Sequence, residues 1–237
     1  MYENLLIKVI TVKTNIERQM SVDAQLSPMG LEYDYIFLYD KDELTENDLH
    51  RVEENGLPLP VISCALKHIQ AQIDFLQSDK DVLLVLEDDV ILKKDFLNAL
   101  NLAIEELCSK EPKLIHLGGE GDKVYVPYML KKGDFFINVP MSTAECYLTN
   151  KAAAKLRVDY LQDNPIHKGA DHLMQDIDII LGIKTQRLNR AYATQGSVTG
   201  DFKTLLDKSR GKHSKAYLKS RFAFTKFRRW IAAIFNK

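Results

Sequence analysis

The stretch Val82-Leu83-Leu84-Val85-Leu86-Glu87-Asp88-Asp89 decides the fold. An apolar run of this kind, leading straight into three carboxylates, is typical of a strand buried on both faces of a helix-covered sheet. The acids are then expected at the C-terminal edge of the sheet, where open α/β sheets bind ligands. Adjacent carboxylates repel one another, and a divalent cation relieves that repulsion. The sequence therefore predicts a metal-assisted site on an α/β scaffold.

Further apolar segments alternate with helical ones, which favours a mostly parallel central sheet flanked by helices. Strands are predicted over residues 5–12, 33–39, 82–86, 113–117 and 145–149. Helices are predicted over residues 18–26, 63–76, 95–107, 151–156 and 171–181, with Ser63 as the N-cap of the second. Residues 40–60 are expected to form a polar surface excursion, and the irregular segment 120–144 is long enough to indicate a functional loop.

The charge of the chain is unevenly distributed. Residues 1–200 hold 21 Lys/Arg and 31 Asp/Glu, whereas residues 201–237 hold eleven and two. The overall net charge of -1 thus hides an acidic body and a basic tail. Such a split indicates an anionic surface as partner. No nucleic-acid partner is expected.

The cysteines and the apolar segments bear on the compartment. Cys64, Cys108 and Cys146 form no CxxC pair, so neither zinc nor a disulfide framework is indicated, and a reducing cytosol fits best. The N-terminal apolar run is broken by Lys8 and does not resemble a signal peptide. No run reaches the roughly 18 apolar residues of a spanning helix. A cytoplasmic protein is expected.

The basic tail is expected to form an amphipathic helix. On a helical wheel the apolar arc holds Tyr217, Phe224, Phe227, Trp230, Ile231, Ile234 and Phe235. The opposite arc holds Lys219, Arg221, Lys226, Arg228 and Arg229, with Leu218 and Phe222 as exceptions on that side. This pattern favours a helix lying on an anionic membrane surface. The alternative is a C-terminal helix packed on the body with a solvated basic face.

Several motifs, taken in order, resemble a known family. They are Ile10-Thr11-Val12 with Arg18, Ser63-Cys64-Ala65-Leu66-Lys67-His68, Leu84-Val85-Leu86-Glu87-Asp88-Asp89-Val90, Ile115-His116-Leu117-Gly118-Gly119, Ala144-Glu145-Cys146-Tyr147-Leu148, Asp171-His172-Leu173 and Gln195-Gly196-Ser197. Over roughly residues 5–200 the chain resembles glycosyltransferase family 25, the lipooligosaccharide and lipopolysaccharide galactosyltransferases. The family usually has Gly and Ser where this chain has Ser63 and Lys67.

The resemblance implies a GT-A-like domain over residues 1–200, with residues 201–237 as a basic amphipathic extension. It implies inverting transfer of a hexose from a UDP-sugar to a lipid-linked oligosaccharide, with galactose as the first candidate for the hexose. Asp89 would bind Mn²⁺ or Mg²⁺ at the donor pyrophosphate, Glu87 would reach the metal shell or the ribose, and Asp88 would contact another group. With the basic tail, this places the protein peripherally on the inner face of the bacterial inner membrane.

An inverting transferase also needs a base for the acceptor hydroxyl. Asp171 is the first candidate, although it could instead be the N-cap of the following helix, and Glu145 is the second. Arg18, Ser63 and His68 are candidate donor contacts. Arg18 could pair with a phosphate or with a surface acid, and Ser63 could open a phosphate-binding helix start. His68 could touch the donor or simply satisfy a polar neighbour. A polar loop near the acceptor is expected at Gln195, Ser197 and Thr199.

Other functions are compatible with the same acids. The three carboxylates could simply cap the next helix. A receiver domain is excluded, because strands precede the acidic one and no apolar run precedes Asp134. A non-catalytic nucleotide-sugar-binding protein of the same fold and a metal-dependent phosphohydrolase remain as alternatives.

Overall fold

A seven-stranded mixed sheet forms the centre of the computed structural model, which describes residues 2–54, 56–120, 133–203 and 213–235. Its strand order is β2-β1-β3-β7-β5-β8-β6, with only β6 and β7 antiparallel to their neighbours. The predicted mostly parallel α/β sheet is therefore confirmed. The strands are β1 Leu5–Ile10, β2 Asp34–Ile36, β3 Val82–Glu87, β5 Lys113–His116, β6 Phe136–Asn138, β7 Cys146–Asn150 and β8 Lys184–Leu188.

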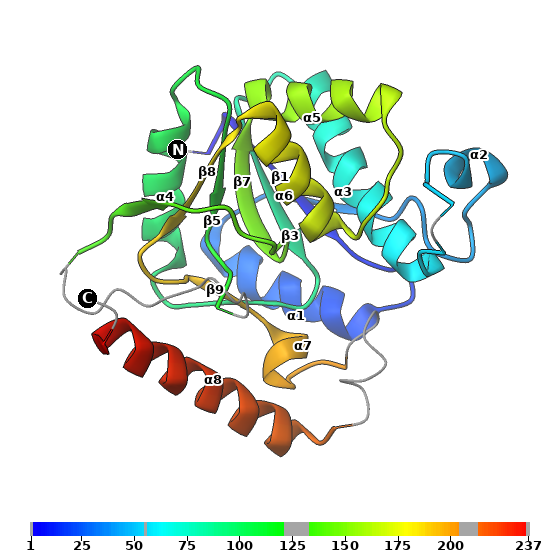
Figure 1. The fold of residues 1–237 in the computed structure, drawn as a ribbon. Helices are drawn as coiled ribbons and strands as arrows, with labels where there is room; N and C mark the ends of the chain where they lie inside the picture. Colours follow the sequence, from blue (N-terminus) through cyan, green and yellow to red (C-terminus); the bar gives the residue numbers. More distant parts are fainter. Residues whose placement is uncertain (1, 55, 121–132, 204–212, 236–237) are drawn as a thin grey trace.

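Helices cover both faces of this sheet (Figure 1). One face packs on α1 (Ile16–Leu26) and α4 (Phe96–Leu107), and the other on α3 (Leu59–Gln77), α5 (Lys151–Asp163) and α6 (Ala170–Leu181). Because β3 lies between these layers, Val82–Leu86 is buried throughout, as the apolar run predicts. The apolar spacing of each helix supplies the face that meets the sheet.

The ends of β1 and β3 coincide in the sheet. The two strands are parallel, and their register pairs Ile10 with Glu87. The residues that follow, Thr11 and Asp88, therefore leave the same edge side by side. This register brings the polar residues after β1 next to the acids after β3.

The start of α3 differs from the prediction. The helix begins at Leu59 after Pro58, and Pro60 lies in its first turn, so Ser63 is one turn inside the helix and buried. Proline suits a first turn because its missing N–H would have no partner there. The prediction that Ser63 caps the helix and offers free N–H groups to a phosphate is wrong.

Other predicted boundaries shift without changing the architecture. Strand β2 is shorter than residues 33–39, and α5 continues to Asp163. The surface excursion 40–60 contains the short helix α2 (Glu46–Leu49), capped by Thr45 and Asp48 in a capping box. Within the expected functional loop 120–144, β6 occupies Phe136–Asn138, whereas residues 121–132 lie outside the described part.

Three further strands that follow the acids were missed. Strand β4 (Val90–Leu92) follows them and pairs antiparallel with β9 (Ala193–Gln195), which leads into the short helix α7 (Gly196–Thr199). Since a strand separates the acids from α4, the alternative that they cap the next helix is wrong. Strand β8, with the sequence Lys-Thr-Gln-Arg-Leu, has no apolar run to reveal it.

A buried ion pair ties α5 to α6. The Arg157 guanidinium donates to both carboxylate oxygens of Asp178, through Nε at 2.6 Å and Nη2 at 2.9 Å. Arg157 is fully buried, and its Nη1 also donates to Thr149 on β7 at 3.1 Å. This bidentate pair fixes α6, whose first turn carries Asp171.

The basic tail forms the predicted helix, α8 (Lys215–Phe235), which lies along the edge of the molecule beside α7 (Figure 1). Leu218 is buried and Phe222 is half-buried, so the side of α8 that carries these two residues faces the body. They are the two apolar residues on the basic side of the predicted helix. In the described ranges, no helix combines the length and apolarity needed to cross a membrane.

Candidate functional site

Asp88 is the most heavily bonded of the three acids. Its carboxylate accepts hydrogen bonds from Thr11 Oγ1 at 2.7 Å, Asn15 Nδ2 at 3.1 Å and Arg18 Nη1 at 2.7 Å. Thr11 and Asn15 come from the segment after β1, and Arg18 from the first turns of α1. Asp88 is thereby a fully satisfied anchor between β1, α1 and β3.

Arg18 lies beside two aspartates. Its Nη1 is 2.7 Å from Asp88 and 4.0 Å from Asp89 Oδ2. Nη2 donates to the backbone oxygen of Lys203, and the guanidinium lies 5.6 Å from the Phe202 ring centre. Arg18 therefore pairs with a buried acid and not with a surface acid, which was one of the two alternatives. Contact with a phosphate stays a prediction.

Asp89 is buried and only partly satisfied. Oδ2 accepts from the Ser197 N–H at 3.2 Å, whereas Oδ1 has no hydrogen-bond partner in the described part of the chain. Burial, followed by the charge of Glu87, raises the pKa of Asp89 to about 6. A cation placed at Oδ1 would relieve both effects.

Gly196 lets the β9–α7 junction close over Asp89. The Gly196 N–H donates to the Asp89 backbone oxygen at 2.7 Å. A Cβ at this position would lie 2.8 Å from that oxygen and 2.6 Å from the Phe202 ring. Only glycine therefore permits this approach, which brings the predicted polar loop at Gln195 and Ser197 against the acids.

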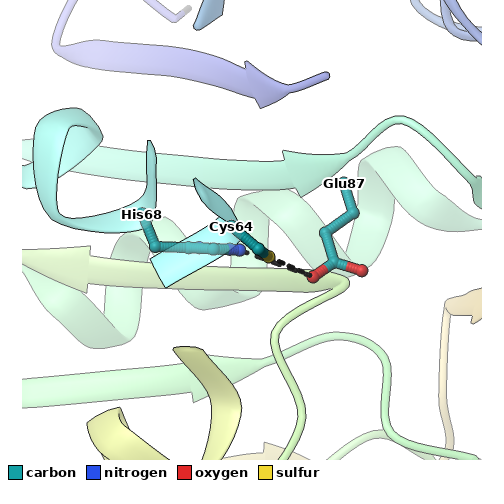
Figure 2. Close-up of side chains that lie close together, drawn as sticks. All are labelled: Cys64, His68 and Glu87. Carbon is teal, nitrogen blue, oxygen red and sulfur yellow. Dashed lines mark hydrogen bonds and ion pairs between the residues drawn. The ribbon is translucent and has the colours of Figure 1, made fainter. Parts of the chain in front are cut away.

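The Glu87 side chain lies against α3. Oε2 accepts from Gln195 Nε2 at 3.1 Å, while Oε1 lies 3.4 Å from His68 Nε2 and 3.9 Å from Cys64 Sγ (Figure 2). Among the described residues, Glu87, Asp88 and Asp89 do not form a group of three in which one carboxylate oxygen of each lies within 4.8 Å of the other two. The acidic motif is thus divided between two neighbouring centres.

Glu145 is buried beneath this region. Its carboxylate accepts from the Gly119 N–H at 2.5 Å and from Thr143 Oγ1, and a Cβ at Gly118 would collide with it. Burial raises the pKa of Glu145 to about 8, against the lowering effect of the backbone hydrogen bonds. Burial therefore makes Glu145 much easier to protonate than an ordinary glutamate.

Asp171 lies in the first turn of α6, and its side chain is 39% exposed. The N-cap of the helix is Gly169, so the alternative that Asp171 caps it is wrong. Its Oδ1 accepts from the His172 N–H at 2.8 Å and lies 3.0 Å from His172 Nδ1. Burial, followed by the charges of Glu87 and Asp171, raises the pKa of the Cys64 thiol.

Sequence reasoning missed Glu120, an acid that joins the tail to the body. Its carboxylate lies 2.9 Å from Lys226 Nζ on α8 and 2.9 Å from Lys93 Nζ, and it accepts from Thr194 Oγ1 at 2.8 Å. The backbone oxygen of Glu120 accepts from Arg229 Nη1 at 2.7 Å. No periodic signal marks an acid in a Gly-Glu-Gly segment.

Thr11 and Asn15 were also missed as partners of the acids. The signal that could have found them is the strand register: a polar residue directly after β1 lies next to the first residue after β3. The structure brings together Arg18, Asp88 and Asp89, and separately His68 and Glu87. Glu145 is buried beneath, and Ser63 contributes no capping group.

The fold and these residues define an α/β protein with a cluster of acids at the carboxyl edge of its sheet, the edge where open α/β sheets bind ligands. The model of the family described as "Glycosyltransferase family 25 (LPS biosynthesis protein)" matches residues 5–132, which is more than half of the chain. The chain belongs to this family and is a glycosyltransferase of lipopolysaccharide biosynthesis. The match includes Arg18, His68 and the three acids, whereas Glu145 and Asp171 lie beyond it.

Several solved structures are similar to the chain at low sequence identity. A glycosyltransferase involved in the glycosylation of the major capsid of PBCV-1 is 12% identical with a TM-score of 0.44, over 92% of this chain and 99% of that one. A197 from STIV is 12% identical with a TM-score of 0.44, over 80% and 83%. A putative glucose-1-phosphate thymidylyltransferase from Bacillus anthracis is 14% identical with a TM-score of 0.39, over 90% and 75%. No curated protein matches the chain.

Proposed function

We propose that this glycosyltransferase moves a hexose from a UDP-sugar to a lipooligosaccharide or lipopolysaccharide acceptor, with inversion at the anomeric carbon. Galactose is the first candidate for the hexose. The observation that carries the proposal is the buried Asp89 at the carboxyl edge of the sheet, whose Oδ1 has no hydrogen-bond partner among the residues that the structure describes. This is where open α/β sheets bind ligands. Residues 1–200 form the transferase domain in this proposal, and residues 201–237 its membrane extension.

Mn²⁺ or Mg²⁺ fits the chemistry of Asp89. Hard divalent cations prefer carboxylate oxygens, and within the described ranges Asp89 Oδ1 is a carboxylate oxygen without a hydrogen bond. When bound, such an ion stabilises the negative charge that develops on the leaving nucleoside diphosphate. Glu87 contributes to the shell of the ion or contacts the ribose. Asp88, held by Arg18 and Thr11, orients the loop that presents Asp89.

Asp171 is the proposed base. Its carboxylate is solvent-accessible, as a group that receives a proton from an incoming acceptor must be. The acceptor hydroxyl oxygen forms a bond to the anomeric carbon while the bond from that carbon to the UDP oxygen breaks. The hydroxyl proton passes to Asp171. Glu145, which is buried and has a raised pKa, is the second candidate for this role.

The outer face of α8 supports a membrane-peripheral location on the anionic inner leaflet. Tyr217, Phe224 and Phe227 are 48%, 61% and 54% exposed. Basic residues flank them, while Leu218 and the Glu120–Lys226 ion pair attach the inner face to the body. Aromatic rings bordered by Lys and Arg suit the interface of an anionic bilayer. The side chains of Trp230, Ile234 and Phe235, also predicted on this face, lie outside the described residues.

One assay tests the proposal as a whole. The full-length chain is incubated with UDP-galactose, Mn²⁺ and truncated lipooligosaccharide, and the product is examined by mass spectrometry and by NMR of the new anomeric centre. We expect a single added hexose of inverted configuration. Binding of UDP without transfer to any acceptor would instead favour a non-catalytic protein. Phosphate release from simple esters without an acceptor sugar would favour a phosphohydrolase.

A further inference from the structure

A second group of potential metal ligands lies behind the acidic motif. Cys64 and His68 are four residues apart on α3 and therefore share one helix face, while Glu87 ends β3. Sγ, Nε2 and a carboxylate oxygen of these residues all lie within 4.8 Å of one another (Figure 2). Cys64 and His68 alone give no zinc signature in the sequence, since the third ligand comes from a different element.

The distances match a tetrahedral ion. Arms of about 2.0–2.3 Å, the usual Zn–N, Zn–O and Zn–S lengths, give tetrahedral edges of roughly 3.3–3.8 Å. The observed edges are 3.4 Å from His68 Nε2 to Glu87 Oε1 and 3.9 Å from Cys64 Sγ to the same oxygen. An ion could occupy the centre after only small side-chain movements.

The imidazole of His68 is an independent indication. The side chain is 1% exposed, and Nε2 makes no hydrogen bond in the described structure although it faces Glu87 and Cys64. Its other nitrogen, Nδ1, lies 3.2 Å from the Tyr147 hydroxyl. A hydrogen bond at Nδ1 fixes the ring and leaves Nε2 to a metal, which is the usual arrangement around ligating histidines.

We infer that Cys64, His68 and Glu87 form a binding site for a borderline-soft divalent cation of the Zn²⁺ class, separate from the Asp89 site. Sulfur, nitrogen and oxygen ligands together select such an ion over Mg²⁺ or Mn²⁺. Three protein ligands leave a fourth position for water or a substrate oxygen. Cys64 and Glu87 are partly exposed, which gives the ion a path of entry.

Such an ion would join α3 to the end of β3. Glu87 is already held by Gln195 through Oε2, so coordination through Oε1 would fix both carboxylate oxygens. Asp88 and Asp89 follow directly in the chain and would be positioned with it. The inference does not depend on the donor or on the acceptor, because it concerns only these three side chains.

Cobalt substitution tests the site without any measurement of transfer. Metal-free full-length protein is titrated with Co²⁺ and followed by absorption spectroscopy, and Zn²⁺ is then added. We expect one equivalent of Co²⁺ to produce a thiolate-to-cobalt charge-transfer band with visible bands of tetrahedral intensity, and Zn²⁺ to remove both. Cys64→Ser should abolish the charge-transfer band. Cys108→Ser, which alters an exposed cysteine outside the cluster, should retain it.

Two further variants make the outcome decisive. Asp89→Asn should leave the cobalt spectrum unchanged, because Asp89 belongs to the other site, whereas His68→Gln should weaken Co²⁺ binding at least tenfold. Circular dichroism shows whether each variant is folded. A charge-transfer band that survives in folded Cys64→Ser, or the absence of stoichiometric Co²⁺ binding by the unmodified protein, would overturn the inference.

Discussion

Arg18 Nη1 lies 2.7 Å from Asp88 Oδ1, and both side chains are less than a tenth exposed. The pair joins the first turns of α1 to the loop after β3, and the same guanidinium reaches the backbone of Lys203. Arg18 therefore connects the acidic motif to the segment that leads towards α8. A buried charge pair of this kind contributes little when intact but is costly to break.

Removal of Arg18 should destabilise the protein. We expect Arg18→Ala to lower the free energy of unfolding by about 3–5 kcal/mol, because Asp88 would be left as a buried charge without its ion-pair partner. The matched control is Arg190→Ala, which breaks an exposed pair with Asp134 and should cost about 0–1 kcal/mol. Urea unfolding followed by circular dichroism measures both. Equal losses would contradict the structural role of Arg18.

The stability of the protein should carry a pH signature from Glu145. Its pKa is about 8 in the folded chain against an ordinary value of 4.5, so the folded state binds the extra proton between these values. The free energy of unfolding must then fall as pH rises from about 5 to 8. Relative to Glu145→Gln, which cannot ionise, the total fall should reach about 3–5 kcal/mol. Parallel pH profiles for the two proteins would show that Glu145 has an ordinary pKa.

Asp89→Asn should remove the metal dependence of transfer. Loss of the carboxylate charge weakens the ion that stabilises the leaving diphosphate, and we expect turnover to fall about 100-fold or more. Asp95→Asn is the matched control, an exposed acid at the start of α4. Rates are measured over a Mn²⁺ titration. Full activity of the Asp89 variant under saturating Mn²⁺ would refute the metal role of this residue.

Asp171→Asn should abolish proton removal but preserve donor binding. General bases typically contribute about 100- to 10,000-fold to the rate, so kcat should fall within that range while the affinity for UDP stays constant. Asp176→Asn provides the control, since it lies on the same helix and pairs with Lys168. Calorimetry with UDP and initial rates with acceptor separate the two effects. If Asp171→Asn keeps its activity and Glu145→Gln loses it, Glu145 is the base.

The exposed aromatic face of α8 should bind anionic vesicles. Phe224→Ser/Phe227→Ser should weaken co-sedimentation with phosphatidylglycerol vesicles about tenfold or more, because each ring contributes apolar area to the interface. The control is Ile179→Ser/Ile180→Ser, which removes an equally exposed apolar pair from α6. Salt should weaken binding of the unmodified protein, since the flanking cations act electrostatically. Unchanged binding by the α8 variant would contradict the membrane proposal.

The sequence was most informative where one element alone carries the signal. The run from Val82 to Leu86 identified the central strand, because a strand covered on both faces is apolar at every position. It was least informative where partners decide the outcome. Strand β8 buries Gln186 and Arg187, and β4 exists through its pairing with β9, so neither has a periodic pattern. Ser63 resembled a cap, but the two prolines before it start the helix earlier.

By itself the sequence determined the fold class, the position of the acids at a strand end and the two-faced tail. These follow from the local period and order of residues, which a single segment contains. Only the tertiary structure decided which residues meet. It placed the Glu87 side chain beside Cys64 and His68, and the Asp88 side chain beside Arg18. It also turned Leu218 and Phe222 of α8 towards the body, because Asp201 and Glu120 attract the lysines on the same side of that helix. Such contacts depend on strand register and helix packing, which bring together residues that are distant along the chain.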